Sequence, residues 1–431
     1  MESPPNPNGT PMHKLMILGS MDEFVDLVEM AKDKGITTLV CDGYEDGPAK
    51  AIADRSYTID VRDTDAIADV CKNEHVDGVI SSFSDLLAEC LMNIASRAGI
   101  PTYCTPDRIR MLREKQMMKQ MFEDLDIPYP KSGVVHRESI EQDIESIGFP
   151  CVIKPVNGYG SRGVFVVDDL QDIETHFDEV AGYSSFEYII AESYNAGFEF
   201  NMMTMIVEGE PWVISIADRE KSHEIDGVVP HVSRIVYPSR FTSRVLPQAR
   251  DIVRRIAKYV GITDGPLCMQ FFYEEDKGIQ VCEATGRFFG YEHELTDIVY
   301  GFNMEELLLA SLYDRTKLQK MLTDHDIHKP HCCGAVIYFQ GRLLTIGDQS
   351  KAVRLGQKKE VEKPWIFYRE GETVIEHGPN PYLALYYVKT ENREEMDELT
   401  QEFYREMHIL DPSGKEVAYQ NQIPDYTPAE K

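Results

Sequence analysis

The apolar positions near the start of the chain form short runs that are separated by longer amphipathic stretches. The first run, residues 14–20, predicts a strand that ends in a glycine turn, and a helical pattern then continues through Lys34. A second strand is predicted over 37–41. Short buried strands alternating with amphipathic helices are typical of a parallel α/β sheet. The pattern predicts an α/β domain over residues 12–104, after a proline-rich disordered tail over 1–11.

The glycines of this predicted domain do not fit a dinucleotide site. Only Gly19 follows the first strand, so the Gly-x-Gly-x-x-Gly spacing that lets a pyrophosphate approach the backbone is missing. A further apolar run, 79–85, leads into a polar loop at the edge of the sheet where ligands often bind. Ser82 and Asp85 are candidates to touch a substrate there. Helix capping by Ser84 or Asp85 is the favoured role.

A helical stripe of apolar side chains comes next, and it contains a lysine. Thr105 and Pro106 are typical of an N-cap and a first turn, and the helix is predicted to continue to Pro128. Lys115 fills one place on the stripe, so we expect it to point inward. It either lies along apolar surface with its ammonium in water or neutralises a bound phosphate. The apolar stripe consists of Met111, Met118, Phe122 and Leu125.

A second lysine stands at the end of a buried strand. The run 151–155 ends in Lys154 and Pro155, and a glycine-rich loop follows over 158–163. A buried ammonium needs an anionic partner, and glycines let backbone N–H groups turn toward a phosphate. A glycine-rich loop alone is more often a simple turn. The lysine four residues before the loop favours a phosphate site.

The region 267–287 predicts a β-hairpin with oxygen ligands on one face. If the turn is centred between Asp276 and Lys277, position sums are constant along the ladder and Gln270 lies opposite Glu283. Opposed side chains on one face lie ~5 Å apart, so the two can share one hard cation. Arg287, just beyond the second strand, can hold an anion beside that cation. The alternative is an ordinary hairpin with a solvated glutamate.

Composition narrows the class of protein. Lys and Arg total 44 against 73 Asp and Glu in 431 residues, a formal net charge of -29. An acidic chain does not favour binding to nucleic acid or to anionic membranes. No apolar run approaches the ~20 residues of a membrane span. Nine scattered cysteines favour reduced thiols and a cytoplasmic location over disulfides or a zinc site.

These features, in this order, resemble the ATP-grasp superfamily of carboxylate-amine ligases, which includes relatives of carbamoyl-phosphate synthase and the L-amino-acid ligases. The resemblance extends from about Thr105 to Leu309. It rests on a series rather than on one motif. The series is Lys115, Phe149 to Pro155, Gly158 to Gly163, Ala191 to Tyr194, Glu199, Gln270 and Glu283 to Arg287.

The resemblance implies a multidomain protein of α/β and α+β structure. The parallel α/β domain would precede an ATP-grasp fold over 105–325, in which two α+β lobes clamp ATP, with a lid at about 133–190. A small β-rich extension with one helix would occupy 326–431. The extension is expected to complete the core, to wall off the site or to build a homodimer interface. Its predicted strands are 333–340, 341–346, 373–377 and 383–388, and its predicted helix is 393–407.

The resemblance also implies a nucleotide site. Lys115 and Lys154 would contact the phosphates of ATP, and the glycine-rich loop would close over them. Adenine would lie at Glu192 and the Tyr194 backbone, and ribose at Glu199. The full implied set of nucleotide-binding residues is Lys115, Lys154, Gly158, Gly160, Ser161, Gly163, Glu192, Tyr194 and Glu199.

By the same resemblance, Gln270, Glu283 and Thr285 would hold Mg²⁺, for which Mn²⁺ can substitute. Arg287 and Lys154 would be catalytic, with Arg287 stabilising the transferred phosphoryl group. The family commonly has Glu-x-Asn-x-Arg here, whereas this chain has Thr285 in place of the asparagine. A hydroxyl coordinates Mg²⁺ more weakly than a carbonyl oxygen. The first metal ion is therefore more strongly expected than the second.

Four further residues are candidates for substrate binding. In related ligases the region between the hinge and the metal strands shapes the acceptor pocket, so Arg219, His231 and Arg234 are candidates to hold a carboxylate or phosphate. His293 is a candidate to contact the amine, although a hydrogen-bonded structural role is favoured for it.

The predicted function is that of an ATP-dependent ligase. It would activate a small carboxylate, most simply an amino acid, as an acyl phosphate and join it to an amine, releasing ADP and phosphate. One alternative is activation of carbamate, bicarbonate or formate. The other is a nucleotide-binding regulatory pseudoenzyme, which Thr285 leaves open.

Overall fold

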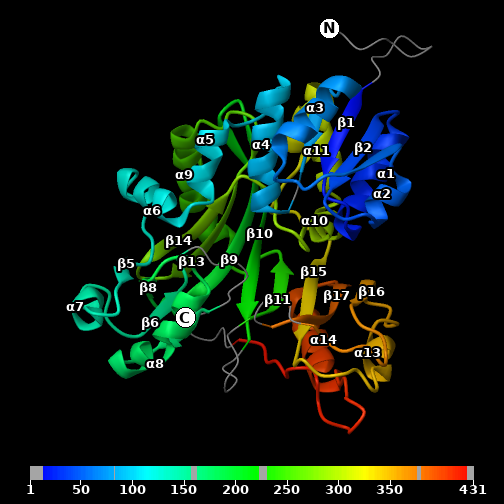
Figure 1. Ribbon diagram of the computed structural model, residues 1–431. Helices are drawn as coiled ribbons and strands as arrows, with labels where there is room; N and C mark the ends of the chain where they lie inside the picture. The colour runs from blue at the N-terminus through cyan, green and yellow to red at the C-terminus, as the bar shows by residue number, and fades with distance from the viewer. Residues whose placement is uncertain (1–12, 82, 157–162, 223–230, 376–379, 425–431) are drawn as a thin grey trace.

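The computed structural model describes residues 13–81, 83–156, 163–222, 231–375 and 380–424. Three sheets make up the molecule: a parallel sheet at the N-terminus, a small antiparallel sheet, and a long antiparallel sheet (Figure 1). This arrangement confirms the predicted mixed α/β and α+β class. None of the described helices has the length and apolar character needed to span a membrane.

The N-terminal sheet has the strand order β3-β2-β1-β4, and all its described pairs are parallel. Its central strands are buried on both faces because helices pack on each side, which is why they are almost wholly apolar. The predicted α/β pattern is therefore confirmed. The elements are β1 Lys14–Leu18, α1 Val25–Asp33, β2 Thr37–Asp42, α2 Pro48–Ile52, β3 Arg55–Thr58, α3 Thr64–Glu74, β4 Gly78–Ile80 and α4 Asp85–Ala98, with a 3₁₀ turn at Asp22–Phe24.

The helix predicted over 105–128 is wrong as a single element. The structure has α5 Pro106–Ile109, a 3₁₀ turn at Arg110–Leu112, and a separate helix α6 over Lys115–Asp124. Glu114 has an extended backbone, with φ -81° and ψ 112°, and this conformation ends one helix and begins the next. Lys115 therefore stands in the first turn of α6. The apolar stripe predicted from helical spacing continues across the break only in part.

The small antiparallel sheet, which we call the lid sheet, has the order β5-β8-β6-β7. Helices α7 Ile140–Ile144 and α8 Leu170–Gly182 pack on one face. The other face carries Val134, Val152, Lys154, Val166 and Glu192, none of which is fully buried. The strands are β5 Ser132–Val135, β6 Cys151–Lys154, β7 Phe165–Val167 and β8 Ile189–Ser193.

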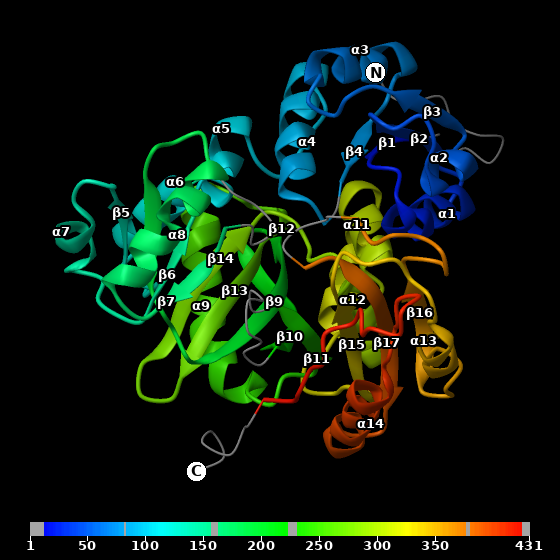
Figure 2. The same ribbon diagram turned by 60° about the horizontal axis from the view of Figure 1, so that its bottom comes forward.

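The long antiparallel sheet has the order β14-β13-β9-β10-β11-β15-β17-β16, and β12 pairs with β9. Helix α9 packs on one end of it and α14 on the other (Figures 1 and 2). The strands are β9 Phe198–Val207, β10 Glu210–Lys221, β11 Val232–Tyr237, β12 Gly265–Pro266, β13 Cys268–Glu274, β14 Gly278–Thr285, β15 Cys333–Gln340, β16 Val361–Ile366 and β17 Tyr382–Thr390. The helices are α9 Thr242–Val260, α10 His293–Tyr300, α11 Met304–Tyr313, α12 Arg315–Asp324, α13 Ser350–Leu355 and α14 Arg393–Glu406.

The C-terminal segment continues the long sheet from β11 through its strands β15, β16 and β17, in line with the expectation that it completes the core. It differs from the prediction in two ways. The runs predicted at 341–346 and 373–377 form only isolated bridges where they are described, such as Thr345 with Thr373. Helix α13 was not predicted. The run 333–340 is buried on both faces, between α10 and α14, which explains why its apolar character is continuous.

Candidate active site

The predicted hairpin exists, and it places Gln270 opposite Glu283. The reason differs from the predicted one. The turn pairs Glu274 with Gly278, so the ladder begins one position away from the assumed register, and a β-bulge at Cys282 then restores the Gln270 and Glu283 pair. A bulge inserts one unpaired residue and re-aims the side chains around it. Cys282 and Glu283 are both exposed as a result.

Glu283 is a free carboxylate within the described part of the chain: no hydrogen bond or ion pair reaches it there. Its side chain reaches solvent but is closely surrounded by protein atoms, and this loss of hydration raises its pKa, as does Asp85 nearby, while Arg287, Arg219 and Lys154 act in the opposite direction. A bound cation would favour the ionised form. Mg²⁺ typically uses one or two protein oxygens and takes its other ligands from phosphate and water, so Glu283 and the Gln270 carbonyl fit such an ion.

The next strand extends this row of polar side chains. Asn201 on β9 lies beside Gln270, and Glu199, two residues earlier, accepts a hydrogen bond from the Gln270 amide. Glu199 also pairs with Arg219 and with Lys221, whose ammonium lies 2.5 Å from its carboxylate. Burial alone would raise the pKa of Glu199, but the two cations lower it. The predicted ribose contact at Glu199 would require rearrangement of these pairs.

Two lysines share one carboxylate on the lid sheet. Lys154 at the end of β6 and Lys119 on α6 each pair with a different oxygen of Glu192 on β8. Burial would raise the pKa of Glu192, but the lysines lower it to about 2. Lys115, one turn before Lys119, is less favourably placed: burial and the charge of Lys154 lower its pKa to about 8. Glu192 therefore lies among three ammonium groups, one from the lid sheet and two from α6.

The N-terminal domain contributes to the end of the hairpin. Asp85, at the start of α4, forms a two-point ion pair with Arg287, with Nη2 2.8 Å and Nε 3.1 Å from its oxygens. The Thr285 hydroxyl donates to the same carboxylate. Burial would raise the pKa of Asp85, but Arg287 and Thr285 lower it. Thr285, predicted as a metal ligand, is thus engaged by Asp85, while Ser84 supplies the predicted helix cap.

A second buried carboxylate lies close to this row. Glu292 accepts hydrogen bonds from the Asn201 amide at 2.5 Å and from the Tyr237 hydroxyl at 2.7 Å. Burial outweighs these bonds and the nearby Arg219 and raises its pKa to about 7. The sequence contains no signal that Glu292 lies beside the polar row, because only the fold brings it to Asn201.

The four predicted substrate residues do not lie together. Arg219 borders the polar row, as described above. Arg234 is fully buried and pairs with Glu220 and Asp397, each at 2.8 Å, which corrects the prediction of a substrate contact. His231 is buried and its ring lies 5.8 Å from that of Tyr419, so it too packs inside the protein.

His293 is buried and paired with carboxylates, which fits the favoured structural role better than the amine contact. It forms ion pairs with Glu305 at 2.6 Å and Glu294 at 3.1 Å. Its ring stacks on Phe83 of the N-terminal domain, with centroids 4.3 Å apart. Burial would lower its pKa, but the surrounding carboxylates raise it to about 9. His293 therefore joins two parts of the chain as a cation.

Some predicted nucleotide residues cannot be placed. Gly158, Gly160 and Ser161 lie outside the described residues. Gly163 is described, and its φ of 64° together with the close approach of Tyr183 and Pro155 suits glycine. Tyr194 is 46% exposed and its backbone N–H donates to the Pro150 carbonyl at 3.1 Å.

Besides Glu292, the sequence prediction missed Lys119 and the pairing of Asp85 with Arg287. Lys119 stands four residues after Lys115 on the same helix, so helical spacing contained a signal for it. Asp85 is 202 positions from Arg287, and no local pattern indicates that contact.

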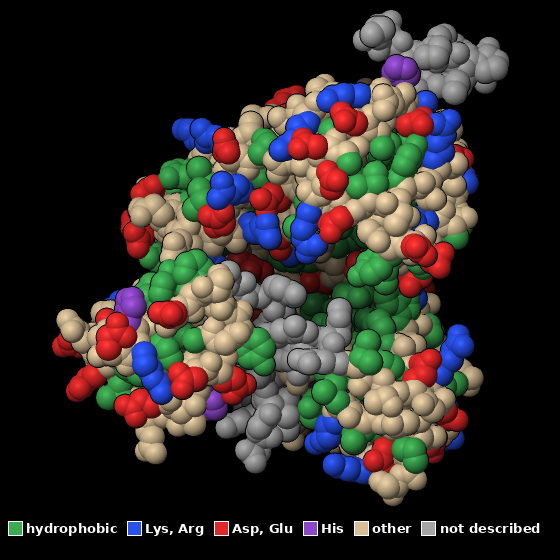
Figure 3. Space-filling model, viewed as in Figure 1, with side chains coloured by type: hydrophobic (Ala, Val, Ile, Leu, Met, Phe, Trp, Pro, Cys, Tyr) green, Lys and Arg blue, Asp and Glu red, His purple; other side chains and the backbone are tan. Residues whose placement is uncertain are grey.

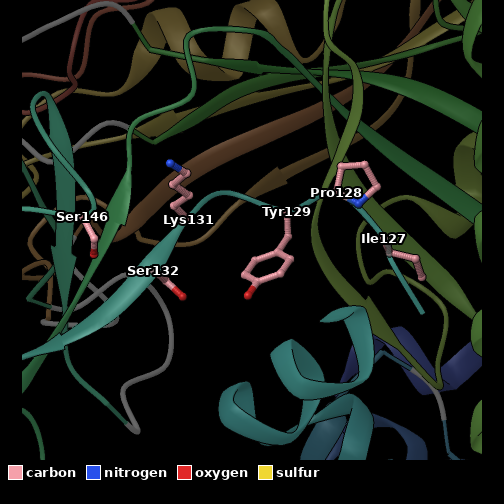
Figure 4. A pocket seen from close by; sticks show the side chains of 6 residues that line it. All are labelled: Ile127, Pro128, Tyr129, Lys131, Ser132 and Ser146. Carbon is pink, nitrogen blue, oxygen red and sulfur yellow. The ribbon is translucent and has the colours of Figure 1, made fainter. Parts of the chain in front are cut away.

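This face of the molecule is hollowed at its centre, and charged side chains gather along the upper margin of that hollow (Figure 3). A separate hollow of about 390 Å³ lies at the connection between α6 and β5 (Figure 4). It contains none of the predicted site residues. Its lining residues are Ile127, Pro128, Tyr129, Lys131, Ser132 and Ser146.

Part of the chain is similar to a known domain family and to proteins of known name. Residues 147–294 match the model of the ATP-grasp domain family. Formate-dependent phosphoribosylglycinamide formyltransferase of Methanocaldococcus jannaschii is 26% identical over 263 residues, which cover 59% of this chain and 66% of the relative. The same-named protein of Sulfurisphaera tokodaii is 24% identical, with the same coverage. The matched segments thus span slightly less than two thirds of these relatives.

Solved structures show the same fold over nearly the whole chain. The L-amino acid ligase of Bacillus licheniformis superimposes with a TM-score of 0.76 at 19% identity, covering 93% of this chain and 98% of the ligase. N5-carboxyaminoimidazole ribonucleotide synthetase of Thermotoga maritima gives a TM-score of 0.69 at 16% identity, with coverage of 93% and 100%. At these identities the likeness concerns the fold.

Proposed function

Because the chain contains an ATP-grasp domain and has the fold of ATP-grasp ligases, we propose that it is an ATP-dependent ligase that couples a carboxylate to an amine. The observation that carries the proposal is the placement of the free Glu283 beside Gln270, with Arg287 and Lys154 close enough to act on its pKa and Lys115 of α6 within reach of its charge. A magnesium nucleotide needs such a set: oxygen ligands for the cation and ammonium groups for the phosphates.

Each group has a part in this proposal. Glu283 and Gln270 would hold Mg²⁺, which would supply positive charge to the phosphates. Lys115 and Lys154 contact the phosphates, and Glu192 gives up Lys154 while Lys119 keeps its charge balanced. Val134 and Val166 are exposed on the face of the lid sheet opposite α7 and α8. These apolar side chains are suited to contact an adenine ring.

The chemistry follows from the weakness of a carboxylate as an acyl donor. Attack of a carboxylate oxygen on the γ-phosphorus breaks the bond to ADP and forms an acyl phosphate. An amine then attacks the acyl carbon, the carbon–oxygen bond to phosphate breaks, and an amide, phosphate and a proton are released. Arg287, held in place by Asp85, would balance charge on the transferred phosphoryl group.

Two candidates for the carboxylate follow from different observations. The names of the curated relatives favour formate, which was the alternative to an amino acid in the sequence prediction. An amino acid is favoured by the aromatic side chains next to the polar row, such as Tyr291 and Trp365. The binding of nucleotide without turnover would favour the regulatory alternative.

The test measures ADP and phosphate release from Mg-ATP in paired panels of carboxylates and amines, with mass spectrometry of each responding mixture. Formate and a set of amino acids are the first carboxylates. ADP that depends on both a carboxylate and an amine, with an amide as the product, is the expected result. AMP with pyrophosphate, or ATP binding without any turnover in Glu283→Gln and wild type alike, would contradict the ligase.

A further inference from the structure

An aromatic cluster lies next to the polar row and has no role in the mechanism above. We define it as Tyr291, Tyr338, Trp365, Phe367 and Tyr382. The Tyr291 ring meets that of Trp365 edge to face at 5.6 Å and that of Tyr382 at 6.2 Å. Phe367 lies 6.2 Å from Trp365 and 6.1 Å from Tyr382. The cluster thus joins the turn after β14 to strands β16 and β17.

The cluster is not simply part of the core of the C-terminal segment. That core lies on the other side of β15 and β17, around Phe339, Tyr386 and Phe403. Phe367 is 39% exposed, and Trp365 and Tyr382 are partly exposed. Aromatic side chains that stay accessible at the border of a polar site are typical of small-molecule pockets.

Two charged groups tie this cluster to the proposed chemistry. Arg219, at the border of the polar row, is close enough to Tyr382 to act on the pKa of the tyrosine. Burial raises this pKa and the arginine lowers it. Glu23, from the loop after β1, acts on Tyr291, whose pKa is raised by burial and then by this carboxylate. Glu23 is half-buried, and within the described residues no hydrogen bond or ion pair engages it. Burial raises its pKa, while the nearby His293, Arg287 and Lys363 act in the opposite direction.

Backbone conformation marks the same border. Tyr291 has φ 56° and Phe83 has φ 71°, a region that bulky L-residues rarely adopt. Gly290, next to Tyr291 in the chain, lies close to Glu23 and Phe83: a Cβ there would lie 2.9 Å from the Glu23 oxygen and 3.2 Å from the Phe83 side chain. Strained aromatic residues persist where the surrounding structure fixes them, commonly at ligand sites.

Resting on the proposed ligase function, we propose that one of its two organic substrates is an amino acid with a large apolar side chain. Its side chain lies against Tyr291, Trp365, Phe367 and Tyr382, and its ammonium faces Glu23. The assignment holds whether the amino acid is the acid that is activated or the amine that accepts the acyl group. Formate and ammonia are too small to use these contacts.

The chain provides its own reporter for this site, because it has only two tryptophans. Trp365 belongs to the aromatic cluster, whereas Trp212 lies on β10 beside Met205, at the end of that strand away from Arg219. In the Trp212→Phe protein, the emission of Trp365 is titrated with L-phenylalanine, L-leucine, glycine, formate and 3-phenylpropanoate. ADP release is measured in parallel.

We expect L-phenylalanine or L-leucine to give a saturable change in emission, at concentrations about tenfold or more below any effect of glycine. Formate should give none. The Glu23→Gln variant should lose the preference for L-phenylalanine over 3-phenylpropanoate, which lacks the ammonium. Asp22→Asn, at the exposed neighbouring residue, is the matched control and should keep that preference. Phe367→Ala should weaken binding, whereas Tyr44→Ala, at a tyrosine 68% exposed elsewhere, should not.

The outcomes separate this inference from the ligase function. Saturable binding of an apolar amino acid without ADP formation would support the substrate class and contradict the ligase. ADP release with formate and ammonia alone, with no amino acid changing the Trp365 emission, would support the ligase and overturn the inference. Equal binding of glycine and L-phenylalanine would overturn it as well.

Discussion

The two faces of strand β10 carry charges of the same kinds with different surroundings. Arg219 and Lys221 point to the face that carries the polar row and pair with Glu199 there, and both keep some exposure. Glu220, between them, points to the opposite face and pairs with Arg234 and Arg393 at 2.8 Å each. Side chains alternate along a strand, so one residue of register separates a candidate ligand site from an internal ion network.

The internal network is closed upon itself. Arg234 has no exposed surface, its Nη1 donates to the Thr400 hydroxyl at 2.8 Å, and Asp397 completes the set from α14. A buried charge with every donor engaged has nothing left for a ligand, whereas a half-exposed charge can change partner at low cost. The comparison therefore predicts opposite effects of substitution on the two faces.

The largest expected effect on folding is at Arg234. Arg234→Met would leave Glu220 with one cation where it had two, and we expect the free energy of unfolding to fall by about 3 kcal/mol. Denaturant unfolding followed by circular dichroism measures it. The activity of the remaining folded protein should be close to that of the wild type. A variant as stable as the wild type but inactive would place Arg234 in the substrate site after all.

Arg219→Met is the matched change on the face of β10 that carries the polar row. Because Lys221 still neutralises Glu199, the free energy of unfolding should change by about 1 kcal/mol or less. We expect kcat/KM to fall by roughly a factor of 10 to 100, since a charge near the transferred group is lost. Steady-state kinetics and denaturant unfolding are compared on one preparation. A large loss of stability with unchanged kinetics would remove the distinction between the faces.

Lys115 predicts a pH dependence of nucleotide binding. With its pKa lowered to about 8 in the free protein, the lysine loses its proton as the pH rises through that value. Phosphate favours the charged form, so the Kd for ATP should be flat below about pH 7.5. Above pH 8 the Kd should rise by up to about tenfold per pH unit. Calorimetry in Lys115→Arg, where the charge persists, should give a flat profile. A wild-type profile that is equally flat would contradict the phosphate contact.

The smallest perturbation uses Cys282, which is exposed in the bulge beside Glu283, whereas Cys332 is partly exposed and the other described cysteines are buried. Although Cys282 reaches solvent, the protein atoms around its thiol and the nearby carboxylates raise its pKa to about 12, so alkylation should be slow. Mg-ATP should slow it further at Cys282 and leave Cys332 unchanged. Mass spectrometry of the two peptides measures both rates. Equal protection of both thiols, or of neither, would place the nucleotide elsewhere.

Local patterns predicted much of this molecule. The strand that carries Lys154, the opposition of Gln270 and Glu283, and the parallel N-terminal sheet all follow from periodicity and turn position. The hairpin pair was correct although the assumed register was not, because the bulge at Cys282 compensates for a turn one residue tighter. Bulges have no reliable signal in a single sequence.

What the sequence did not predict depends on contacts between distant segments. Arg234 and Arg219 look alike in sequence, and only the packing of α14 against β11 and β15 distinguishes them. Asp85 and Glu292 became relevant because other elements bring Arg287 and Asn201 to them. The break at Glu114 likewise overrides a helical pattern that is favourable on both sides of it.

In the proposed reaction, the carboxylate attacks the γ-phosphorus at the row formed by Gln270, Glu283 and Arg287. The most direct test supplies the carboxylate that responds in the substrate panel with ¹⁸O in both oxygens and analyses the phosphate released. Transfer of one ¹⁸O into inorganic phosphate, in step with ADP and lost in Glu283→Gln, is the predicted result. Phosphate without label, or label appearing in AMP, would contradict an acyl phosphate at this site.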